Sequence, residues 1–124
     1  MSMKAMKRLD IIIRPEKLEK LKEILEKKDY SGMTVFTAMG CGYQEGFIPE
    51  FEEMNFEINL LPKVVVMVVV WEEDVEDLLG AIHEELATGQ VGDGRVFISP
   101  VDDVMRIRTG ERGDIALYNA EQER

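Results

Sequence analysis

The stretch VVVMVVVW, residues 64–71, is an unbroken apolar run and decides the fold more than any other part of the chain. Its β-branched side chains favour a strand, yet it lacks the polar and apolar alternation of a strand with one wet face. The run therefore predicts a strand that is covered on both faces, or one whose second face is buried by another subunit.

Two amphipathic helices are expected, one before and one after this strand. Residues 16–28 and 75–86 each place apolar side chains on one face at three- and four-residue spacing. The second helix begins after the acidic residues 72–74, which complement a helix N-terminus, and is expected to end near Gly89. The apolar positions are Leu18, Leu21, Ile24 and Leu25 in the first helix, and Val75, Leu78, Leu79, Ile82 and Leu86 in the second.

Further strands surround these helices. Residues 9–13 are apolar except for Asp10, and this stretch stops before Pro15. Residues 33–39 and 95–99 carry the β-branched and aromatic residues typical of strands, and residues 103–109 are expected to add a short fifth strand. This order predicts an α+β fold, a ferredoxin-like split β-α-β with an antiparallel sheet and both helices on one face. Because the opposite face is apolar and needs a partner, we expect an oligomer.

The length and charge of the chain limit the number of domains and the classes of partner that it can have. Its 124 residues suit a single domain, residues 1–124, and the 45% of hydrophobic residues suit a packed core. With 25 Asp and Glu against 15 Lys and Arg, the net charge is −10, which argues against nucleic acid as a partner. The longest apolar run is far too short to span a bilayer, so no membrane insertion is expected.

The reactive residue types form no catalytic set in the sequence. The single cysteine, Cys41, cannot form an internal disulfide, and the N-terminus has no apolar signal-peptide core, so we expect a cytoplasmic protein. His83 lies beside the apolar stripe of the second helix without metal-ligand spacing, which favours a packing role. Because neither a Ser-His-Asp set nor paired carboxylates can be assembled, we expect a protein that is not an enzyme.

The segment TGQVGDGR, residues 88–95, ends the second helix and precedes a strand. Three glycines in six residues allow positive φ angles and let successive N–H groups form a concavity that binds an anion. A tight helix-to-strand turn explains the same residues without any ligand. The segment is not a Walker A loop, because no Gly-Lys-Ser/Thr follows.

Arginines gather after this segment. No Lys or Arg occurs in residues 64–94, and then Arg95, Arg106 and Arg108 appear around short strands. Arg106 and Arg108 are two apart, so in a strand they would point to the same side, where two like charges favour a bound anion. The acids that would instead neutralise them are Asp102, Asp103 and Glu111. Together with the glycines, the arginines favour a polyphosphate site.

The connection formed by residues 43–62 is long for a compact domain, and such loops are usually functional or mobile. It contains no Lys or Arg, and aromatic side chains interleave with its glutamates. A solvated excursion with some buried anchors would explain it, but the density of aromatics favours a loop that binds a partner. The residues expected to dock the partner are Phe47, Phe51, Glu52, Glu53 and Phe56.

Six motifs, in order, resemble the PII nitrogen-regulatory signalling family over residues 7–117. The motifs are Ile12-Ile13-Arg14-Pro15, Gly32-Met33-Thr34-Val35, Gly40-Cys41-Gly42-Tyr43-Gln44-Glu45-Gly46, Leu61-Pro62-Lys63-Val64, and residues 88–97 and 104–111. In the family's terms the long connection is the T-loop (about 42–60), the glycine segment is the B-loop (88–95), and residues 106–117 are the C-terminal loop. Each motif alone is modest, but together their order and spacing are similar to those of the family.

The resemblance implies a homotrimer that binds ATP or ADP competitively in clefts between subunits. It also implies regulation of a target protein, a membrane transporter or a cytosolic enzyme, through the T-loop. The implied nucleotide-binding residues are Thr34, Gly40, Gly42, Gln44, Lys63, Val69, Gly92, Asp93, Gly94, Arg95, Arg106 and Arg108, with Thr34 and Val69 near the adenine. Gln44 would ligate a Mg²⁺ that bridges ATP to 2-oxoglutarate, and Lys63 with Arg14 would meet the carboxylates of that diacid.

The T-loop departs from the family pattern. Phe56 and Met54 stand where some members carry a modified tyrosine or serine, so the known covalent switches are expected to be absent. Glu52 replaces an arginine that enters ammonium channels, and Glu45 adds negative charge near the expected diacid. The alternative function is a ferredoxin-like structural or adaptor subunit with a vestigial nucleotide site.

Overall fold

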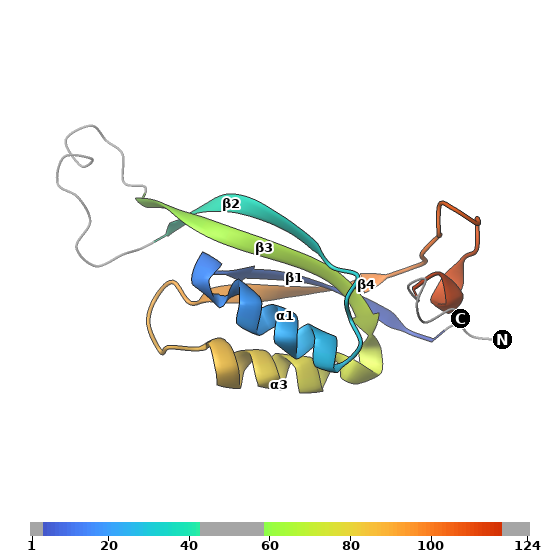
Figure 1. Cartoon of the computed structure of the whole chain (residues 1–124), viewed down its shortest axis with the longest axis horizontal. Helices are drawn as coiled ribbons and strands as arrows, with labels where there is room; N and C mark the ends of the chain where they lie inside the picture. The colour runs from blue at the N-terminus through green and yellow to red at the C-terminus, as the bar shows by residue number, and fades with distance from the viewer. Residues whose placement is uncertain (1–3, 43–58, 118–124) are drawn as a thin grey trace.

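The computed structural model describes residues 4–42 and 59–117, in which four antiparallel strands form one sheet and two helices cover one of its faces (Figure 1). The strands lie in the order β2-β3-β1-β4. Their bounds are Met6–Ile13 for β1, Thr34–Gly42 for β2, Asn59–Trp71 for β3 and Gly94–Val101 for β4, and the helices are α1, Leu18–Lys27, and α3, Val75–Leu86. Short 3₁₀ turns span Pro15–Lys17, Glu72–Asp74 and Gly113–Leu117. The predicted ferredoxin-like α+β fold is confirmed.

The register of the sheet defines two ends that matter for the site. The central strand, β1, pairs antiparallel with both β3 and β4. Ile13 pairs with Gly94 at one end, and Met6 pairs with Val101 at the other. We call them the B-loop end and the C-terminal end, because the B-loop enters β4 at the first and the chain leaves β4 for the C-terminal loop at the second (Figure 1).

The valine run is buried on the face that the helices cover. Val64, Val66, Val68 and Val70 are each at most 5% exposed. They pack in one core with residues of β1, α1 and α3 that are at most 1% exposed, namely Leu9, Ile11, Leu21, Leu25 and Leu78. Full burial of such a side chain contributes roughly 1.5–3 kcal/mol, so the apolar spacing of the sequence coincides with the positions that hold the two layers together.

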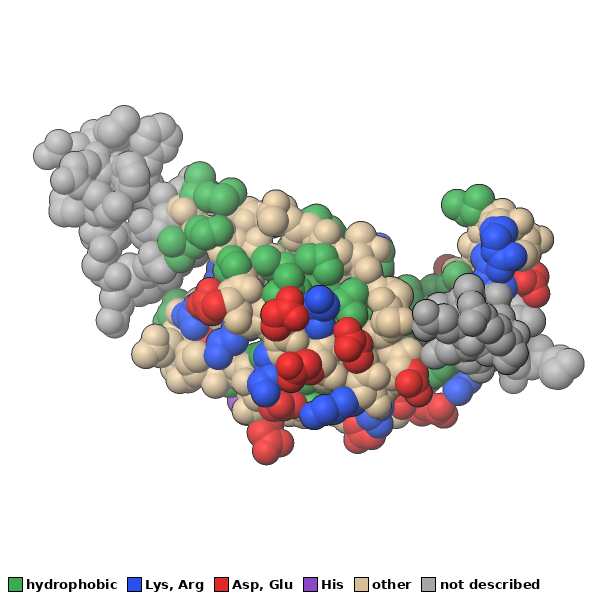
Figure 2. Space-filling view, in the orientation of Figure 1, with side chains coloured by type: hydrophobic (Ala, Val, Ile, Leu, Met, Phe, Trp, Pro, Cys, Tyr) green, Lys and Arg blue, Asp and Glu red, His purple; other side chains and the backbone are tan. Residues whose placement is uncertain are grey.

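The opposite face of the sheet is apolar in part and also carries the Arg8–Asp10 ion pair of β1. Val65 and Val69 lie on it, and Phe36 of β2 pairs with Val65 in the register. Phe36 and Phe97 of β4 are 49% and 52% exposed, so the described residues leave the aromatic side chains of this face half uncovered. By contrast, charged side chains of both signs gather over the helices, and hydrophobic ones appear along the β2 edge (Figure 2).

The prediction of a short strand at residues 103–109 is wrong. In the described chain this segment forms a turn with one isolated bridge. The Gly110 amide bonds the Arg106 carbonyl at 2.7 Å, and Gly110 has a φ of +76°, so the chain folds back instead of extending. The second helix ends at Leu86, earlier than the expected end near Gly89, because the next residue is already extended.

Tyr30 ties the end of α1 to the junction between β3 and α3. Its hydroxyl accepts a hydrogen bond from the Trp71 amide at 2.9 Å and donates one to the Asp74 carboxylate. Burial, with the neighbouring carboxylate, raises the pKa of Tyr30 above its ordinary value. The side chain therefore joins two elements while its hydroxyl stays neutral.

Candidate functional site

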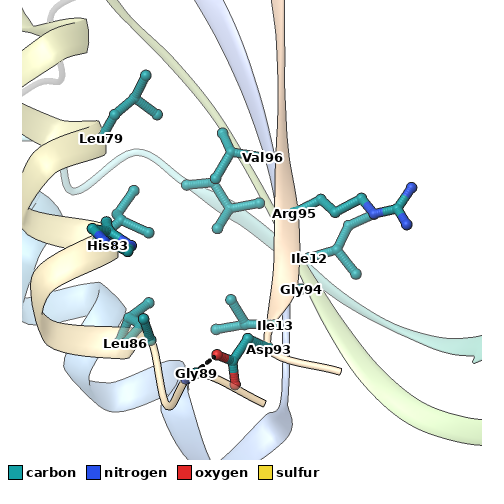
Figure 3. Close-up of a pocket in the computed structure, with 13 residues that line it drawn as sticks. Ile12, Ile13, Leu79, His83, Leu86, Gly89, Asp93, Gly94, Arg95 and Val96 are labelled. Atoms are coloured by element: carbon teal, nitrogen blue, oxygen red, sulfur yellow. Dashed lines mark hydrogen bonds between the residues drawn. The ribbon is translucent and has the colours of Figure 1, made fainter. Parts of the chain in front are cut away.

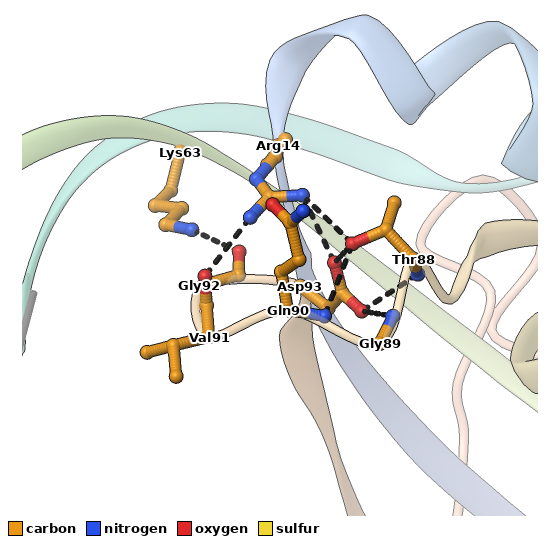
Figure 4. Close-up of polar contacts among 8 residues, drawn as sticks. All are labelled: Arg14, Lys63, Thr88, Gly89, Gln90, Val91, Gly92 and Asp93. Atoms are coloured by element: carbon orange, nitrogen blue, oxygen red, sulfur yellow. Dashed lines mark hydrogen bonds and ion pairs between the residues drawn. The ribbon is translucent and has the colours of Figure 1, made fainter. Parts of the chain in front are cut away.

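Asp93 is the centre of the B-loop. Its carboxylate accepts hydrogen bonds from the Thr88 amide at 2.8 Å, the Thr88 hydroxyl at 2.5 Å and the Gly89 amide at 3.0 Å (Figure 4). Arg14, just before the first 3₁₀ turn, adds an ion pair of 2.9 Å. These bonds, above all those from Thr88, lower the pKa of Asp93 to about 2. The loop is thus folded around an ionised carboxylate of its own.

Two cations hold the same loop by its carbonyl groups. Arg14 donates to the Val91 carbonyl at 3.0 Å, and Lys63 donates from β3 to the Gly92 carbonyl at 2.6 Å (Figure 4). An anion between Arg14 and Lys63 would replace the neutral carbonyl acceptors by charged ones. Hydrogen bonds with a charged partner are about twice as strong as those between neutral groups. This corner of the fold is therefore a candidate anion site.

Glycine is required where the B-loop approaches β1 and where the Lys63 side chain lies against β2. Gly94 has a φ of +113°, and a Cβ there would lie 1.8 Å from the backbone oxygen of Ile12. A Cβ on Gly40 of β2 would lie 2.9 Å from the Lys63 Cγ. Four of the expected nucleotide-binding residues other than Asp93 thus meet at the B-loop end, namely Gly40, Lys63, Gly92 and Gly94.

The concavity expected from successive amides is partly filled by the loop itself. The Thr88 and Gly89 amides donate to Asp93, so they already bind a carboxylate. The attraction for an external anion therefore comes mainly from Arg14 and Lys63. The sequence prediction did not include Thr88 among the site residues, although a hydroxyl or amide that bonds a nearby side chain is a common way to close such a turn.

Arg106 and Glu111 face each other across the C-terminal loop. The Arg106 Nη1 lies 2.6 Å from the Glu111 carboxylate, and the Arg106 side chain is only 13% exposed. The Thr109 hydroxyl donates to the same carboxylate oxygen at 2.8 Å. Glu111, one of the acids that the sequence offered as a partner, therefore pairs with Arg106 within this chain.

Asp103 closes the base of this loop. Its carboxylate accepts hydrogen bonds from the Val104 amide at 2.8 Å and the Gly113 amide at 3.1 Å, and from the Arg112 Nε at 2.7 Å. The Val104 amide and the Arg112 side chain lower the pKa of Asp103. The loop thus keeps a defined shape through side-chain contacts, without the predicted strand.

Other expected site residues lie away from the B-loop end. Val69 lies toward the C-terminal end of β3, and Thr34 begins β2 opposite Met67. Arg106 and Arg108 follow β4, and Figure 1 shows their loop and the B-loop at opposite ends of the sheet. One chain therefore does not bring these arginines to the glycines.

Most residues predicted to act in the T-loop lie outside the part of the chain that the structure describes. The residues that lie outside the described ranges are Gln44, Phe47, Phe51, Glu52, Glu53 and Phe56. Gly42 is the last residue of β2. Within residues 4–42 and 59–117, no three His, Cys, Asp or Glu side chains form a group suited to a metal ion. In the same ranges, neither helix has the length and apolarity needed to cross a membrane.

A hollow lies between α3 and β4, beside the B-loop (Figure 3). It measures about 340 Å³, and its walls are mostly apolar, with Leu79, Leu86 and Val96 facing it. His83 lines the hollow and is exposed, whereas Arg95 points away from α3 (Figure 3). Gly94, at the start of β4, also lines the hollow.

A family model described as "Nitrogen regulatory protein P-II" matches residues 6–111. The chain belongs to the nitrogen regulatory protein P-II family. It is 46% identical over 115 residues to Nitrogen regulatory protein P-II 1 of Methanothermobacter thermautotrophicus, across 93% of this chain and 100% of that protein. It is 40% identical over 112 residues to Nitrogen regulatory protein P-II of Azospirillum brasilense, across 90% of this chain and 100% of that relative.

Solved P-II structures share the fold. The B. subtilis GlnK–ATP complex matches with a TM-score of 0.76 at 30% identity, over 94% of this chain and 100% of the other. Arabidopsis thaliana PII bound to citrate matches with a TM-score of 0.71 at 33% identity, over 90% and 92% of the two chains. The family resemblance drawn from the motifs is confirmed, and the B-loop, Arg106 and Arg108 all lie inside the region that the P-II family model matches.

Proposed function

We propose that this P-II chain is a cytoplasmic signalling regulator that binds ATP or ADP, with the nucleotide phosphates at the B-loop. The observation that carries the proposal is the convergence of Arg14 and Lys63 on a loop that Gly94 holds against the sheet. A phosphate would replace the neutral Val91 and Gly92 carbonyls as partner of these cations. The relative solved as a GlnK–ATP complex supports an adenine nucleotide as the ligand.

A second copy of the chain is proposed to complete each nucleotide site. The arginines of the C-terminal loop and the glycines of the B-loop lie at opposite ends of the sheet, so one chain does not supply both (Figure 1). A head-to-tail contact between the two ends generates a ring when the rotation between neighbouring copies closes. Ile107, which is 90% exposed, and the half-exposed Phe36 and Phe97 offer apolar surface for it. We propose a homotrimer.

At the nucleotide site between two copies, the residues of each copy would have different roles. Arg106 and Arg108 of one copy would reach the phosphates at the B-loop of the next, and Thr34 and Val69 would lie near the adenine. The role of Asp93 is indirect, since its ionised carboxylate binds the loop amides and Arg14 and so keeps the loop closed. This division explains why a negatively charged residue belongs to a phosphate site.

We also propose that 2-oxoglutarate binds near Arg14 and Lys63. Two cations side by side suit a molecule with two carboxylates, and the Arabidopsis thaliana relative was solved bound to citrate, which is also a polycarboxylate. A Mg²⁺ would be held by the ATP phosphates and by Gln44, and it would supply a positive charge that bridges the nucleotide to the diacid. Titration of the ATP-loaded protein with 2-oxoglutarate and Mg²⁺ tests this effector directly.

The T-loop is proposed to dock a target, either a membrane transporter or a cytosolic enzyme of nitrogen metabolism. The aromatic anchors would be Phe47, Phe51 and Phe56, with Glu52 and Glu53 at the rim. Aromatic anchors dominate interface energetics, whereas rim charges mainly steer the encounter, so the target should present a basic rim around an apolar pocket. Replacing Phe51 by Ala should abolish capture of the target and leave ATP affinity unchanged.

Calorimetric titration of the purified protein tests the nucleotide proposal. We expect ATP and ADP to bind and to compete, and we expect Lys63→Ala to weaken both by at least about tenfold, because it removes a charged partner of the phosphates. Lys27→Ala, at an exposed position of α1, is the matched control and should bind like wild type. A folded oligomer that binds neither nucleotide would contradict the proposal and favour the adaptor alternative.

A further inference from the structure

Glu111 lies against the arginine that is proposed to meet the nucleotide phosphates. The Arg106 Nη1 is 2.6 Å from the Glu111 carboxylate, and the Thr109 hydroxyl donates to the same carboxylate at 2.8 Å. The Arg106 amide also bonds the Glu111 carbonyl at 2.8 Å, so the backbone fixes these residues opposite each other. A negative charge is therefore built into the C-terminal half of the proposed cleft.

We propose that Glu111 is a specificity-determining residue that reduces the preference of the site for ATP over ADP. The proposal rests on the proposed function, since it takes Arg106 to be a partner of the phosphates. A fixed carboxylate repels each phosphate charge that comes near Arg106, and ATP carries roughly one more negative charge than ADP. The penalty therefore grows with the number of phosphates, and ATP bears more of it.

The burial of Arg106 makes this charge effective. Its side chain is 13% exposed, so water and salt screen charges beside it less than they screen charges at an open surface. Glu111 is 39% exposed, which keeps the effect moderate. Even at the dielectric constant of water, a unit charge about 7 Å from a phosphate changes an affinity by about threefold per phosphate charge, and the weaker screening beside Arg106 makes this value a lower bound.

Such a residue suits a protein that responds to two competing nucleotides. If one nucleotide binds far more tightly, it fills the site at all physiological ratios and the other nucleotide is never sensed. The cations of the proposed cleft would by themselves favour the more highly charged nucleotide; they are Arg14, Lys63, Arg95, Arg106 and Arg108. Glu111 offsets part of that bias while it holds Arg106 in place.

Two kinds of substitution separate the charge of Glu111 from its shape. Glu111→Gln removes the charge, but its amide oxygen still accepts the hydrogen bonds from Arg106 and Thr109. Glu111→Ala also removes the charge and serves if the Gln variant fails to assemble. Glu111→Asp keeps the charge. Glu84→Gln on the exposed side of α3 makes the same change in net charge at a distance and is the matched control.

The test is a set of calorimetric dissociation constants for ATP, ADP and AMP with the full-length wild type and these variants. Glu111→Gln should tighten ATP binding at least about threefold more than ADP binding, and ADP binding at least about threefold more than AMP binding. Glu111→Asp and Glu84→Gln should keep the wild-type ratios. An unchanged ratio of ATP to ADP affinity in both Glu111→Gln and Glu111→Ala would overturn the proposal, as would weaker ATP binding by an assembled Glu111→Gln variant. Wild-type protein that binds no nucleotide would instead remove the proposed function itself.

Discussion

Arg14 and Asp93, 79 residues apart in the chain, form an ion pair of 2.9 Å that ties the B-loop to the end of the first strand. The same guanidinium donates to the Val91 carbonyl, so it contacts the B-loop at two residues. The loop is therefore closed before any nucleotide arrives, and less conformational freedom remains to be lost on binding. Lys63 adds a third contact from β3 at the Gly92 carbonyl.

Acid should loosen this loop through Asp93. Its pKa is lowered from 3.8 to about 2, so its ionised form stabilises the fold. That stabilisation is fully present above about pH 4 and is lost as the pH falls through about 2. Urea unfolding between these pH values should show a steeper loss of stability for wild type than for Asp93→Asn. The exposed Asp102→Asn serves as control, and equal slopes for wild type and Asp93→Asn would contradict the assignment.

Two glycine substitutions should have opposite effects on stability. A Cβ at Gly94 would lie 1.8 Å from the Ile12 oxygen, so Gly94→Ala should cost about 3 kcal/mol or more. Gly80, in the exposed part of α3, has nothing within 4 Å of its Cβ position, so Gly80→Ala should stabilise by about 0.5–1 kcal/mol. Urea unfolding measures both. A Gly94→Ala variant as stable as wild type would show that the loop does not approach β1 as closely as described.

Tyr30→Phe should destabilise the fold by about 1–3 kcal/mol, because it removes the hydroxyl that joins the Trp71 amide to Asp74. The pKa of Tyr30 is raised in the folded state, so its contribution is intact below the unfolded value of 10.0 and is lost as the pH rises beyond it. Wild-type stability should therefore fall in alkali by more than that of Tyr30→Phe. Equal losses of stability in alkali for wild type and Tyr30→Phe would show that the Tyr30 hydroxyl does not join the Trp71 amide to Asp74.

Arg106→Ala should weaken ATP binding by roughly 1.5–3 kcal/mol, the range for a charge-assisted contact. Arg106→Lys keeps the charge and loses the planar fork, so it should fall between wild type and the Ala variant. Calorimetry with the oligomeric protein gives all three affinities. Identical ATP affinities would remove Arg106 from the phosphate site.

The arrangement of the strands and helices could be predicted from the sequence because apolar spacing reports burial directly. Val66 belongs to an unbroken apolar run and Leu78 to a pattern of three- and four-residue spacing, and both are buried in one core. Residues 64–71 also have no polar side chain on either side of the strand, which indicates that the second side of this strand is apolar as well. The burial pattern of each helix and strand depends on residues close together in the chain, so it can be predicted from the sequence.

The C-terminal loop could not be predicted in the same way. Arg106 and Arg108 have the spacing of one strand face, but the Arg106–Glu111 pair and the turn at Gly110 decide the local shape. Likewise, Arg14 was assigned only through the family resemblance. Its contact with Asp93 depends on β1 and β4 lying side by side in one register, which periodicity along the chain does not reveal.

The central claim is that nucleotide binds between the B-loop end of one copy and the C-terminal loop of the next, and mixing two variants tests it most directly. Lys63→Ala disables the first half and Arg106→Ala the second, so each variant alone should bind ATP poorly. In a randomly mixed ring, roughly a quarter of the clefts combine two intact halves. ATP binding of near wild-type affinity should therefore reappear at that fraction of sites after the two variants are refolded together. Mixed rings, verified by mass, that bind ATP no better than either parent would contradict the account.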